Sequence, residues 1–404
     1  MKIDGNIANE LFRAFNIQRW NDRPRPMDLY EMDKHAHKMM IAYCLGKYEE
    51  SEGREIEWER LIRHSVFELF RRIVTSDIKS PILDQIRKNK QVYHQLNEYV
   101  YRQLQPKFTG TSLEEPLHDY LFAKHEGEGD LTDRVVSAAH IYASYLEFQS
   151  IFPVNPTYYQ NIKIQTELSN TLNKYRDLVG IRKLINRLSV SNFIDLCGQL
   201  RYQIRWAQTP RVPQTTVLGH SMMVAVLSYF MTVDLPHCPK RIFNNFFCGI
   251  FHDLPEVVTR DIISPVKRAS NELEDLISSI ERELGEQEIF PLIESDWVSE
   301  IKYFTQNEFA NKYIDNGETI LAQGIDDITT NYNENRFSPL DGEIVRAADR
   351  FSAFLEAWNS CVAGIKSDEF LAALDKIKKE HLAKFRSPID FASMFDDFDI
   401  DSLK

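Results

Sequence analysis

The chain has few cysteines and no long apolar run. Its five cysteines form no Cys-x-x-Cys pair and are odd in number. This pattern indicates reduced thiols, without a disulfide framework or a cysteine zinc site. The longest apolar run, Met222–Phe230, is about half the length of a membrane-spanning helix, and the N-terminus lacks the apolar segment of a signal peptide. We therefore expect a cytoplasmic protein that has no membrane partner.

Basic charge is also scarce. The formal net charge of −12 argues against a nucleic-acid polymer as partner, because a phosphate backbone binds basic surfaces. A single nucleotide is compatible with this charge, since a few local Arg and Lys side chains suffice to bind it. The chain is 43% hydrophobic and 27% charged, as in ordinary globular proteins. Its 404 residues are long for one core, so we expect two domains.

Glycine is sparse, with 15 residues in 404. We predict no β-hairpin of the kind that Asn-Gly or Asp-Gly turns form. Apolar residues instead recur at the spacing of one helix face within residues 243–251 and 344–355. The sequence therefore predicts an all-α fold built of helical bundles.

Comparison of the chain with itself reveals five short matches in the same order. Such ordered matches are typical of an internal repeat. We predict a tandem duplication followed by an acidic, loosely packed tail at residues 386–404. The matched segments are residues 19–20 (RW) with 205–206 (RW), 37–42 (HKMMIA) with 220–225 (HSMMVA), 64–68 (HSVFE) with 252–256 (HDLPE), 76–82 (SDIKSPI) with 260–266 (RDIISPV), and 135–149 with 344–358.

The second copy contains adjacent metal-binding side chains. His252 and Asp253 end an apolar helical stretch, and Leu254-Pro255 follows them at once, so the chain turns away there. A lone His-Asp pair is weak evidence for a site. His220, however, opens another apolar helix, so its imidazole borders the core.

Asp349 lies in a helical segment that is otherwise apolar. A buried aspartate costs several kcal/mol unless it is paired or binds a metal. Taken alone, Asp349 is better explained as an ion-pair partner of Arg346 or Arg350. Together with His220 and the His-Asp pair, however, it completes two imidazoles and two carboxylates. This donor set suits cobalt, manganese, zinc or iron(II), with room left for a water and a phosphate oxygen.

The ordered pattern H…HD…D resembles the HD-domain superfamily of metal-dependent phosphohydrolases. It is most similar to the bacterial HD-domain 5′-deoxynucleotidases. The segments that carry this resemblance are residues 204–211 (IRWAQTPR), 252–267 (HDLPEVVTRDIISPVK) and 363–374 (AGIKSDEFLAAL). One departure is Gly219, where those enzymes usually have Glu before the His. The resemblance implies an intact HD phosphohydrolase domain at residues 187–385.

Carried over position by position, the resemblance implies one divalent transition metal. Its ligands would be His220, His252, Asp253 and Asp349.

Five further residues acquire roles from the same resemblance. Glu256 would be the general acid/base, and Asp261 would lie beside the reacting phosphate or sugar. Arg205 and Lys267 would neutralise phosphate charge. Without the resemblance, both would be interpreted as ordinary basic residues of the protein surface. Trp206 would wall the sugar, although a core tryptophan is nearly as good an explanation. The corresponding alternative for Glu256 is a solvated carboxylate at a helix start.

The first copy, residues 1–180, lacks a complete ligand set. His37 and His64 persist, but Ser65 stands in place of Asp253, and His140 in place of Asp349. We favour a degenerate HD-like domain kept for packing over a zinc site made of three imidazoles.

The leading functional hypothesis is hydrolysis of (deoxy)nucleoside 5′-monophosphates by a metal-activated water. An HD hydrolase of another nucleotide is the alternative within the same chemistry: an alarmone, a nucleoside triphosphate or a cyclic dinucleotide. A nucleotide-sensing protein without turnover is the alternative from another class. Because related single-domain nucleotidases are expected to be homodimers, we expect the two copies to form an intrachain pseudo-dimer.

Overall fold

The computed structural model describes residues 4–123, 129–260, 262, 270–384 and 391–403. Helices dominate it, and the predicted all-α class is confirmed. The N-terminal half contains α1 (Gly5–Phe12), α2 (Glu31–Ser51), α3 (Trp58–Thr75), α4 (Ser80–Lys88), α5 (Lys90–Phe108), α6 (Glu114–Phe122), α7 (Leu131–Ile151), α8 (Tyr159–Asn173) and α9 (Val179–Ile185).

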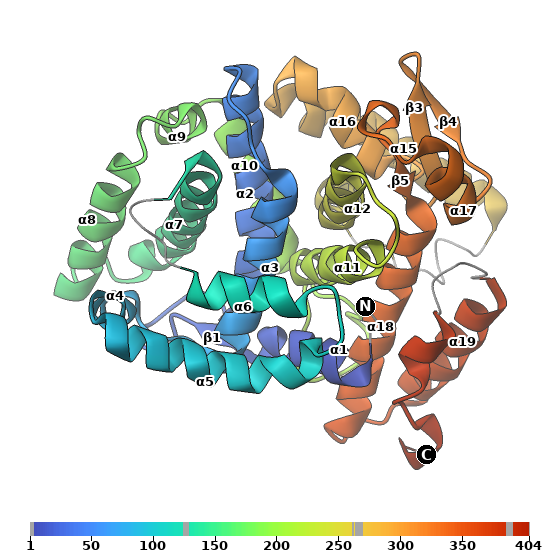
Figure 1. Cartoon of the computed structure of the whole chain (residues 1–404), viewed down its shortest axis with the longest axis horizontal. Helices are drawn as coiled ribbons and strands as arrows, with labels where there is room; N and C mark the ends of the chain where they lie inside the picture. The colour runs from blue at the N-terminus through green and yellow to red at the C-terminus, as the bar shows by residue number, and fades with distance from the viewer. Residues whose placement is uncertain (1–3, 124–128, 261, 263–269, 385–390, 404) are drawn as a thin grey trace.

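The C-terminal half is also helical and carries most of its helices on the right of Figure 1. Its helices are α10 (Ser189–Gly198), α11 (Val217–Thr232), α12 (Pro239–Phe251), α13 (Glu256–Thr259), α15 (Asn271–Leu284), α16 (Ser295–Thr305), α17 (Ile325–Asp327), α18 (Gly342–Val362) and α19 (Asp368–Lys384). No helix in the described ranges is long and apolar enough to cross a membrane.

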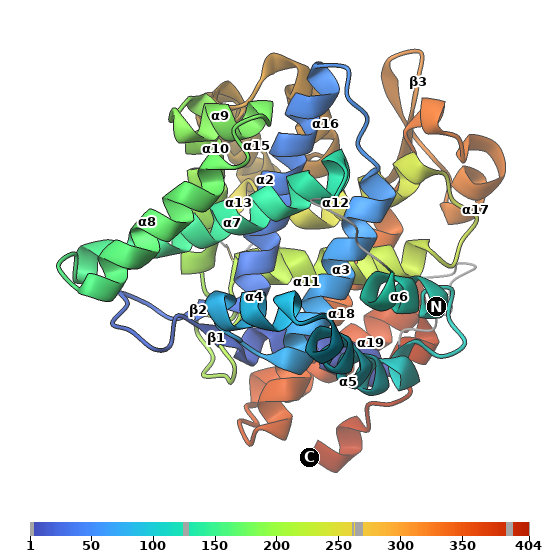
Figure 2. The same ribbon diagram turned by 60° about the vertical axis from the view of Figure 1, so that its left-hand side comes forward.

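Helices α2 and α11 cross at the centre of the molecule and pack against each other (Figures 1 and 2). Every residue of α11 is buried. A helix that is hydrophobic all round belongs inside a core, which explains the long apolar run in the sequence. Helix α2 packs against α7 on the N-terminal side, and α11 packs against α12 and α18 on the other. One apolar core therefore extends through both halves.

Aromatic rings join the halves beside this crossing. Tyr43 of α2 lies 5.2 Å from Phe247 of α12, measured between ring centroids. Trp58, at the start of α3, meets Phe243 of α12 edge-on at 4.9 Å. Such pairs add to the energy gained from burial alone, and they hold α12 at a fixed place against the N-terminal half.

Within the described ranges, two small sheets accompany the helices. Strands β1 (Gln18–Arg19) and β2 (Leu29–Tyr30) pair in the N-terminal half, and β3 (Asn311–Asp315) pairs with both β4 (Glu318–Leu321) and β5 (Leu340–Asp341), all antiparallel. The prediction of no hairpin was wrong. Asn316 and Gly317 join β3 to β4 with φ of 50° and 83°, and such positive values favour Asn-Gly in tight hairpins.

The C-terminal tail is packed rather than loose over its described part, residues 391–403. Phe395 is fully buried, and its ring lies 4.9 Å from that of Phe354 in α18. Asp397 accepts a hydrogen bond from the backbone amide of Gly5 at 2.7 Å. The expectation of a loose tail was wrong because its phenylalanines cover α18 and its acid binds the start of α1.

Candidate metal centre

Three helices of the C-terminal half bring the four predicted metal ligands together. His220 lies in the first turn of α11, and Asp349 lies in the second turn of α18. His252 and Asp253 follow the last residue of α12 directly. Both histidines are buried, while the carboxylates of Asp253 and Asp349 are 18% and 29% exposed. The centre therefore has a buried imidazole side and a carboxylate side that reaches solvent.

The side-chain distances are those of a compact cluster. One ligand atom each from His220, His252 and Asp349 lies within 4.8 Å of the others. Nε2 of His220 is 3.0 Å from Oδ1 of Asp349 and 3.8 Å from Oδ2 of Asp253. Nε2 of His252 is 3.2 Å from the same Asp253 oxygen. All four side chains thus face one small volume.

Hydrogen bonds behind the two imidazoles fix their orientation. Nδ1 of His252 lies 2.9 Å from the carbonyl oxygen of Gly249, which can only accept. Nδ1 therefore donates to this carbonyl, and Nε2 faces the cluster. Nδ1 of His220 lies 3.0 Å from the hydroxyl of Ser352, so its Nε2 faces the cluster as well. Metal-binding histidines are commonly held this way through the second ring nitrogen.

The cluster has the electrostatics of a cation site. Burial lowers the pKa of His252, but the negative charge of the nearby Asp253 outweighs burial and raises this pKa to about 9. Burial raises the pKa of Asp349, yet His220 and His252 hold it below its usual value. Buried Nε2 of His252 makes no hydrogen bond of good geometry, despite the nearby Asp253 oxygen. Two carboxylates and this imidazole fit a divalent cation.

Asp349 pairs with His220 rather than with a neighbouring arginine. In the described structure, Arg350 lies 3.4 Å from Glu380, and the guanidinium of Arg346 lies over the ring of Phe309 at 5.2 Å. The ion-pair alternative for Asp349 is therefore not supported by the arrangement of these side chains.

Glu356 of α18 organises the Arg205-Trp206 pair beside the centre. This fully buried carboxylate accepts hydrogen bonds from Nε of Arg205 at 3.1 Å, Nε1 of Trp206 at 2.6 Å and the Thr215 hydroxyl at 3.0 Å. Its Oε1 lies 3.7 Å from Nδ1 of His220. Burial raises the pKa of Glu356, but Arg205 and His220 hold it below its usual value. Glu356 thus links the arginine to a predicted metal ligand.

Arg205 and Trp206 are adjacent in the chain but contact different parts of the structure. Nη1 of Arg205 lies 3.9 Å from Oδ2 of Asp253, so the guanidinium borders the cluster. The ring of Trp206 meets Phe370 of α19 edge-on at 5.3 Å and is partly buried. Trp206 therefore combines a packing contact with its hydrogen bond to Glu356.

Glu256 opens α13, directly after the His-Asp turn, and is buried. Its backbone carbonyl accepts a hydrogen bond from the Gln203 side chain at 2.8 Å. Asp261 and Lys267 lie outside the described residues.

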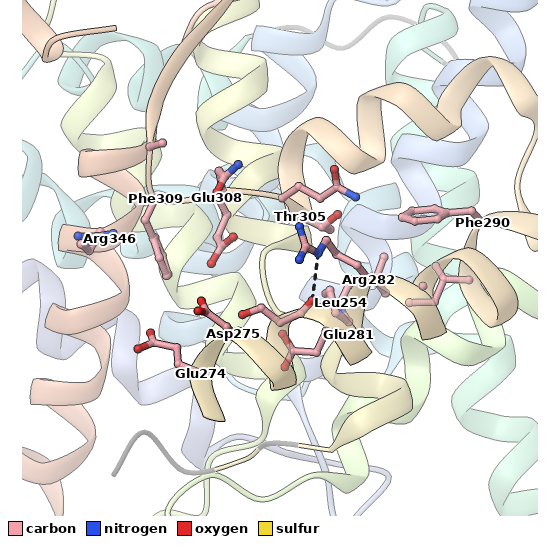
Figure 3. A pocket seen from close by; sticks show the side chains of 17 residues that line it. Leu254, Glu274, Asp275, Glu281, Arg282, Phe290, Thr305, Glu308, Phe309 and Arg346 are labelled. Atoms are coloured by element: carbon pink, nitrogen blue, oxygen red, sulfur yellow. Dashed lines mark hydrogen bonds between the residues drawn. The ribbon is translucent and has the colours of Figure 1, made fainter. Parts of the chain in front are cut away.

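A pocket of about 570 Å³ adjoins the centre (Figure 3). Leu254, which follows Asp253, lines it, and so does Phe309, whose ring centroid is 6.2 Å from that of His252. Figure 3 shows Arg346 and Phe309 at one end, Phe290 at the other and Arg282 between them. The volume of this pocket is within the range of pockets that hold small molecules.

Comparison with known proteins agrees with this arrangement. Residues 197–378 match the HD domain family. The match therefore begins in α10 and includes all four clustered side chains. It does not reach the helices of the N-terminal half.

About half of the chain is also similar to bacterial 5′-deoxynucleotidases. A 5′-deoxynucleotidase of Cronobacter sakazakii is 21% identical over 210 residues, which is 50% of this chain and 89% of that protein. A 5′-deoxynucleotidase of Klebsiella pneumoniae is 23% identical over 215 residues, with the same shares of each chain. Each relative is thus matched over most of its length by about half of this chain.

The histidines of the predicted first copy do not form a cluster. His37 accepts from the Arg201 guanidinium through Nδ1 at 2.9 Å, and its Nε2 lies 2.9 Å from the Ile194 carbonyl. His64 lies instead near Asp133, with Nδ1 3.7 Å from Oδ1. Among the described residues, no metal-like group contains His37, His64 or His140. The three-imidazole zinc site is therefore not assembled.

A lysine lies beside His140 instead. Nζ of the fully buried Lys34 is 2.7 Å from Nδ1 of His140, and Glu68 Oε1 is 3.0 Å from the same nitrogen. Lys38 lies 2.5 Å from the other oxygen of Glu68. Burial lowers the pKa of Lys34 to about 7, with Arg19 contributing in the same direction. Amino groups thus occupy this part of the N-terminal half.

Proposed function

We propose that the chain is a metal-dependent phosphohydrolase that hydrolyses (deoxy)nucleoside 5′-monophosphates to nucleoside and phosphate. The observation that carries this proposal is the cluster of His220, His252 and Asp349, whose ligand atoms lie within 4.8 Å of one another, with Oδ2 of Asp253 3.2 Å from Nε2 of His252. The HD domain match and the similarity to 5′-deoxynucleotidases support the reaction class and the substrate class. The unpaired cysteines support the cytoplasm as the location of this activity.

His220, His252, Asp253 and Asp349 would hold one divalent ion of the cobalt, manganese, zinc or iron type. Such an ion acidifies a water and offsets phosphate charge. The donor set leaves the carboxylate side of the cluster toward solvent, where a phosphate can approach.

The surrounding residues would bind the substrate and move the proton. Arg205 borders Asp253 and would offset phosphate charge, as would Lys267. Glu256, buried at the start of α13, would transfer the proton of the attacking water, and Asp261 would orient the phosphate or sugar. Trp206 would wall the sugar. The adjoining pocket would accept the part of the nucleotide that does not react.

The test is phosphate release from a panel of nucleotides, with and without added cobalt or manganese. The panel includes monophosphates, triphosphates, a guanosine alarmone and a cyclic dinucleotide. Asp253→Ala should lose both metal and turnover, while His140→Ala in the other half should keep both. Release from another nucleotide alone would favour the alternative HD hydrolase. Metal binding without any release would favour a nucleotide sensor.

We further propose that the chain arose by tandem duplication, with halves at residues 1–180 and 187–385. The Arg-Trp pair and its glutamate occur twice. Glu147 of α7 accepts from Nε of Arg19 at 3.0 Å and from Nε1 of Trp20 at 2.9 Å, as Glu356 does from Arg205 and Trp206. Both tryptophans have a positive φ, 55° and 54°. A bulky residue rarely adopts this conformation, so its recurrence supports common ancestry.

The same duplication would make the halves an intrachain pseudo-dimer. In a twofold interface the same element of each copy meets its counterpart near the axis. Helices α2 and α11, which carry the matched HKMMIA and HSMMVA segments, do cross and pack (Figure 2). Residues 187–404 expressed alone should therefore self-associate or be poorly soluble. A stable, fully monomeric fragment in light scattering would contradict the pseudo-dimer.

A further inference from the structure

The helix that carries His220 begins inside the protein. Thr216 caps α11, and its hydroxyl accepts a hydrogen bond from the backbone amide of Gly219 at 2.9 Å. The Thr216 carbonyl accepts from the amide of His220 at 3.0 Å. Thr216 is buried, as are the first residues of α11. Water is thus a poor substitute for the cap, because amides at a buried helix start need a protein partner.

Asp33 of α2 holds this cap from the N-terminal half. Its Oδ1 lies 2.6 Å from the Thr216 hydroxyl, and Asp33 is only 2% exposed. The hydroxyl has one proton, which it donates to the carboxylate, and its lone pair then faces the amide of Gly219. Asp33, Thr216 and Gly219 therefore form a relay that ends one residue before His220.

Gly219 occupies the helix position where a capping acid is ordinarily found. In a capping box, the third helical residue after a Thr cap is Glu or Gln. Here a Cβ at Gly219 would lie 2.6 Å from Oδ1 of Asp33 and 2.6 Å from Cε1 of Phe15. No side chain fits there while Asp33 and Phe15 fill the space. The N-terminal half thus supplies a carboxylate where α11 itself has none.

We propose that Asp33 is a positioning residue for the metal centre, which fixes the first turn of α11, and hence His220, through the Thr216 hydroxyl. This role rests on the proposed metal centre of the C-terminal half. It makes that centre dependent on the N-terminal half, beyond the packing role expected for a degenerate copy. A negative charge at a helix N-terminus is also favourable with respect to the helix dipole.

The test combines metal affinity with hydrogen exchange. Cobalt affinity is measured by calorimetry for the full chain and for Asp33→Ala, Asp33→Asn, Thr216→Val and the Asp33→Ala/Thr216→Val double variant. Amide exchange at the start of α11 is followed by mass spectrometry without metal. Outer-layer partners of metal ligands are worth roughly 10–100-fold in affinity. We expect Asp33→Ala to weaken cobalt binding roughly tenfold, and Asp33→Asn, which keeps an acceptor oxygen, by less.

The double variant distinguishes the relay from two independent effects. If Asp33 acts through Thr216, the double variant should bind cobalt no more weakly than the worse single variant. Additive losses would overturn the proposal, as would wild-type affinity in Asp33→Ala. Should the wild-type chain bind no cobalt, the metal centre itself fails. Exchange then decides the cap alone: faster exchange at the start of α11 in Asp33→Ala upholds it, and unchanged exchange refutes it.

Glu49→Gln is the matched control. Glu49 is a fully buried carboxylate of the same helix α2, and it accepts from the amide of Val179 at 2.8 Å, at the start of α9. Its loss should destabilise the chain without changing cobalt affinity. Equal losses of affinity in Glu49→Gln and Asp33→Ala would show a general effect of destabilisation and would overturn the positioning role.

Discussion

Replacing Glu356 by Gln should damage both the stability of the chain and the metal centre. The carboxylate is fully buried and accepts from Arg205, Trp206 and Thr215. Gln has a similar shape but no charge, and its amide nitrogen must face one of these donors. Removing one partner of a buried ion pair costs about 3–5 kcal/mol. Because Gln keeps one acceptor oxygen, we expect a loss near 3 kcal/mol in the free energy of unfolding.

Glu147→Gln provides a control within the same chain. Glu147 accepts from Arg19 and Trp20 and is 1% exposed, so its loss should cost about as much stability. Only Glu356, however, lies near a predicted metal ligand, at 3.7 Å from Nδ1 of His220. Glu356→Gln alone should therefore weaken cobalt binding, by roughly 10–100-fold.

Urea unfolding and cobalt titration measure these two effects separately. The low pKa of Glu356 also predicts a dependence on pH. Burial opposes the shift, but Arg205 and His220 lower this pKa below 4.5. The stability it contributes is complete above 4.5 and is lost as the pH falls through the lower folded-state value. Equal cobalt affinities in Glu356→Gln and Glu147→Gln would refute the link between Glu356 and the centre.

Three other substitutions test separate groups. Glu256→Gln should keep metal but slow phosphate release by roughly 10²–10⁴, and wild-type turnover would leave Glu256 a structural residue. Trp206→Ala should narrow any preference for deoxynucleotides over ribonucleotides in competition assays, whereas an unchanged ratio would remove its role at the sugar. Because the pKa of Lys34 is lowered by burial from its ordinary 10.5 to about 7 in the folded chain, wild-type stability should rise between these pH values, by up to about 1.36 kcal/mol per pH unit. Urea unfolding of Lys34→Met should lack this rise, and parallel pH profiles would contradict the shifted pKa.

The helical fold was predictable because apolar residues recur at the helical period over whole segments. The hairpin of β3 and β4 was missed although Asn316-Gly317 is present, because β4 is exposed along its length and lacks an apolar alternation. The packing of the tail was also missed, although its apolar residues do carry a pattern. The tail is rich in acidic residues, which are typical of exposed segments. Its phenylalanines nevertheless recur at a helical spacing that indicates a buried face, namely Phe391, Phe395 and Phe398.

The four clustered side chains could be proposed as metal ligands from sequence because their order along the chain resembles the H…HD…D pattern of the HD-domain superfamily. The residues that orient them carry weaker signals. Ser352 is an ordinary helix residue, and its contact with His220 joins positions 132 apart in the chain. Glu356 did have a signal, since it and Glu147 occupy matching places in the repeated segments 344–358 and 135–149. Only the structure shows what this matching position does: Glu356 accepts hydrogen bonds from Arg205 and Trp206.

The most similar sequence segments of the proposed repeat do not align the residues that occupy equivalent positions in the structure. The HKMMIA and HSMMVA segments align His37 with His220, yet His37 faces α10 rather than α7. Counting from the two Arg-Trp pairs aligns Lys34 with His220, and Lys34 does contact His140 of α7, much as His220 contacts Asp349 of α18. The two registers differ by three residues, which is close to one helical turn. Apolar positions recur after one turn, so their similarity survives such a shift, whereas a ligand position does not. On the proposed duplication, Lys34 therefore stands where the C-terminal half has the predicted metal ligand His220, and its amino group contacts His140 in place of a metal-binding imidazole.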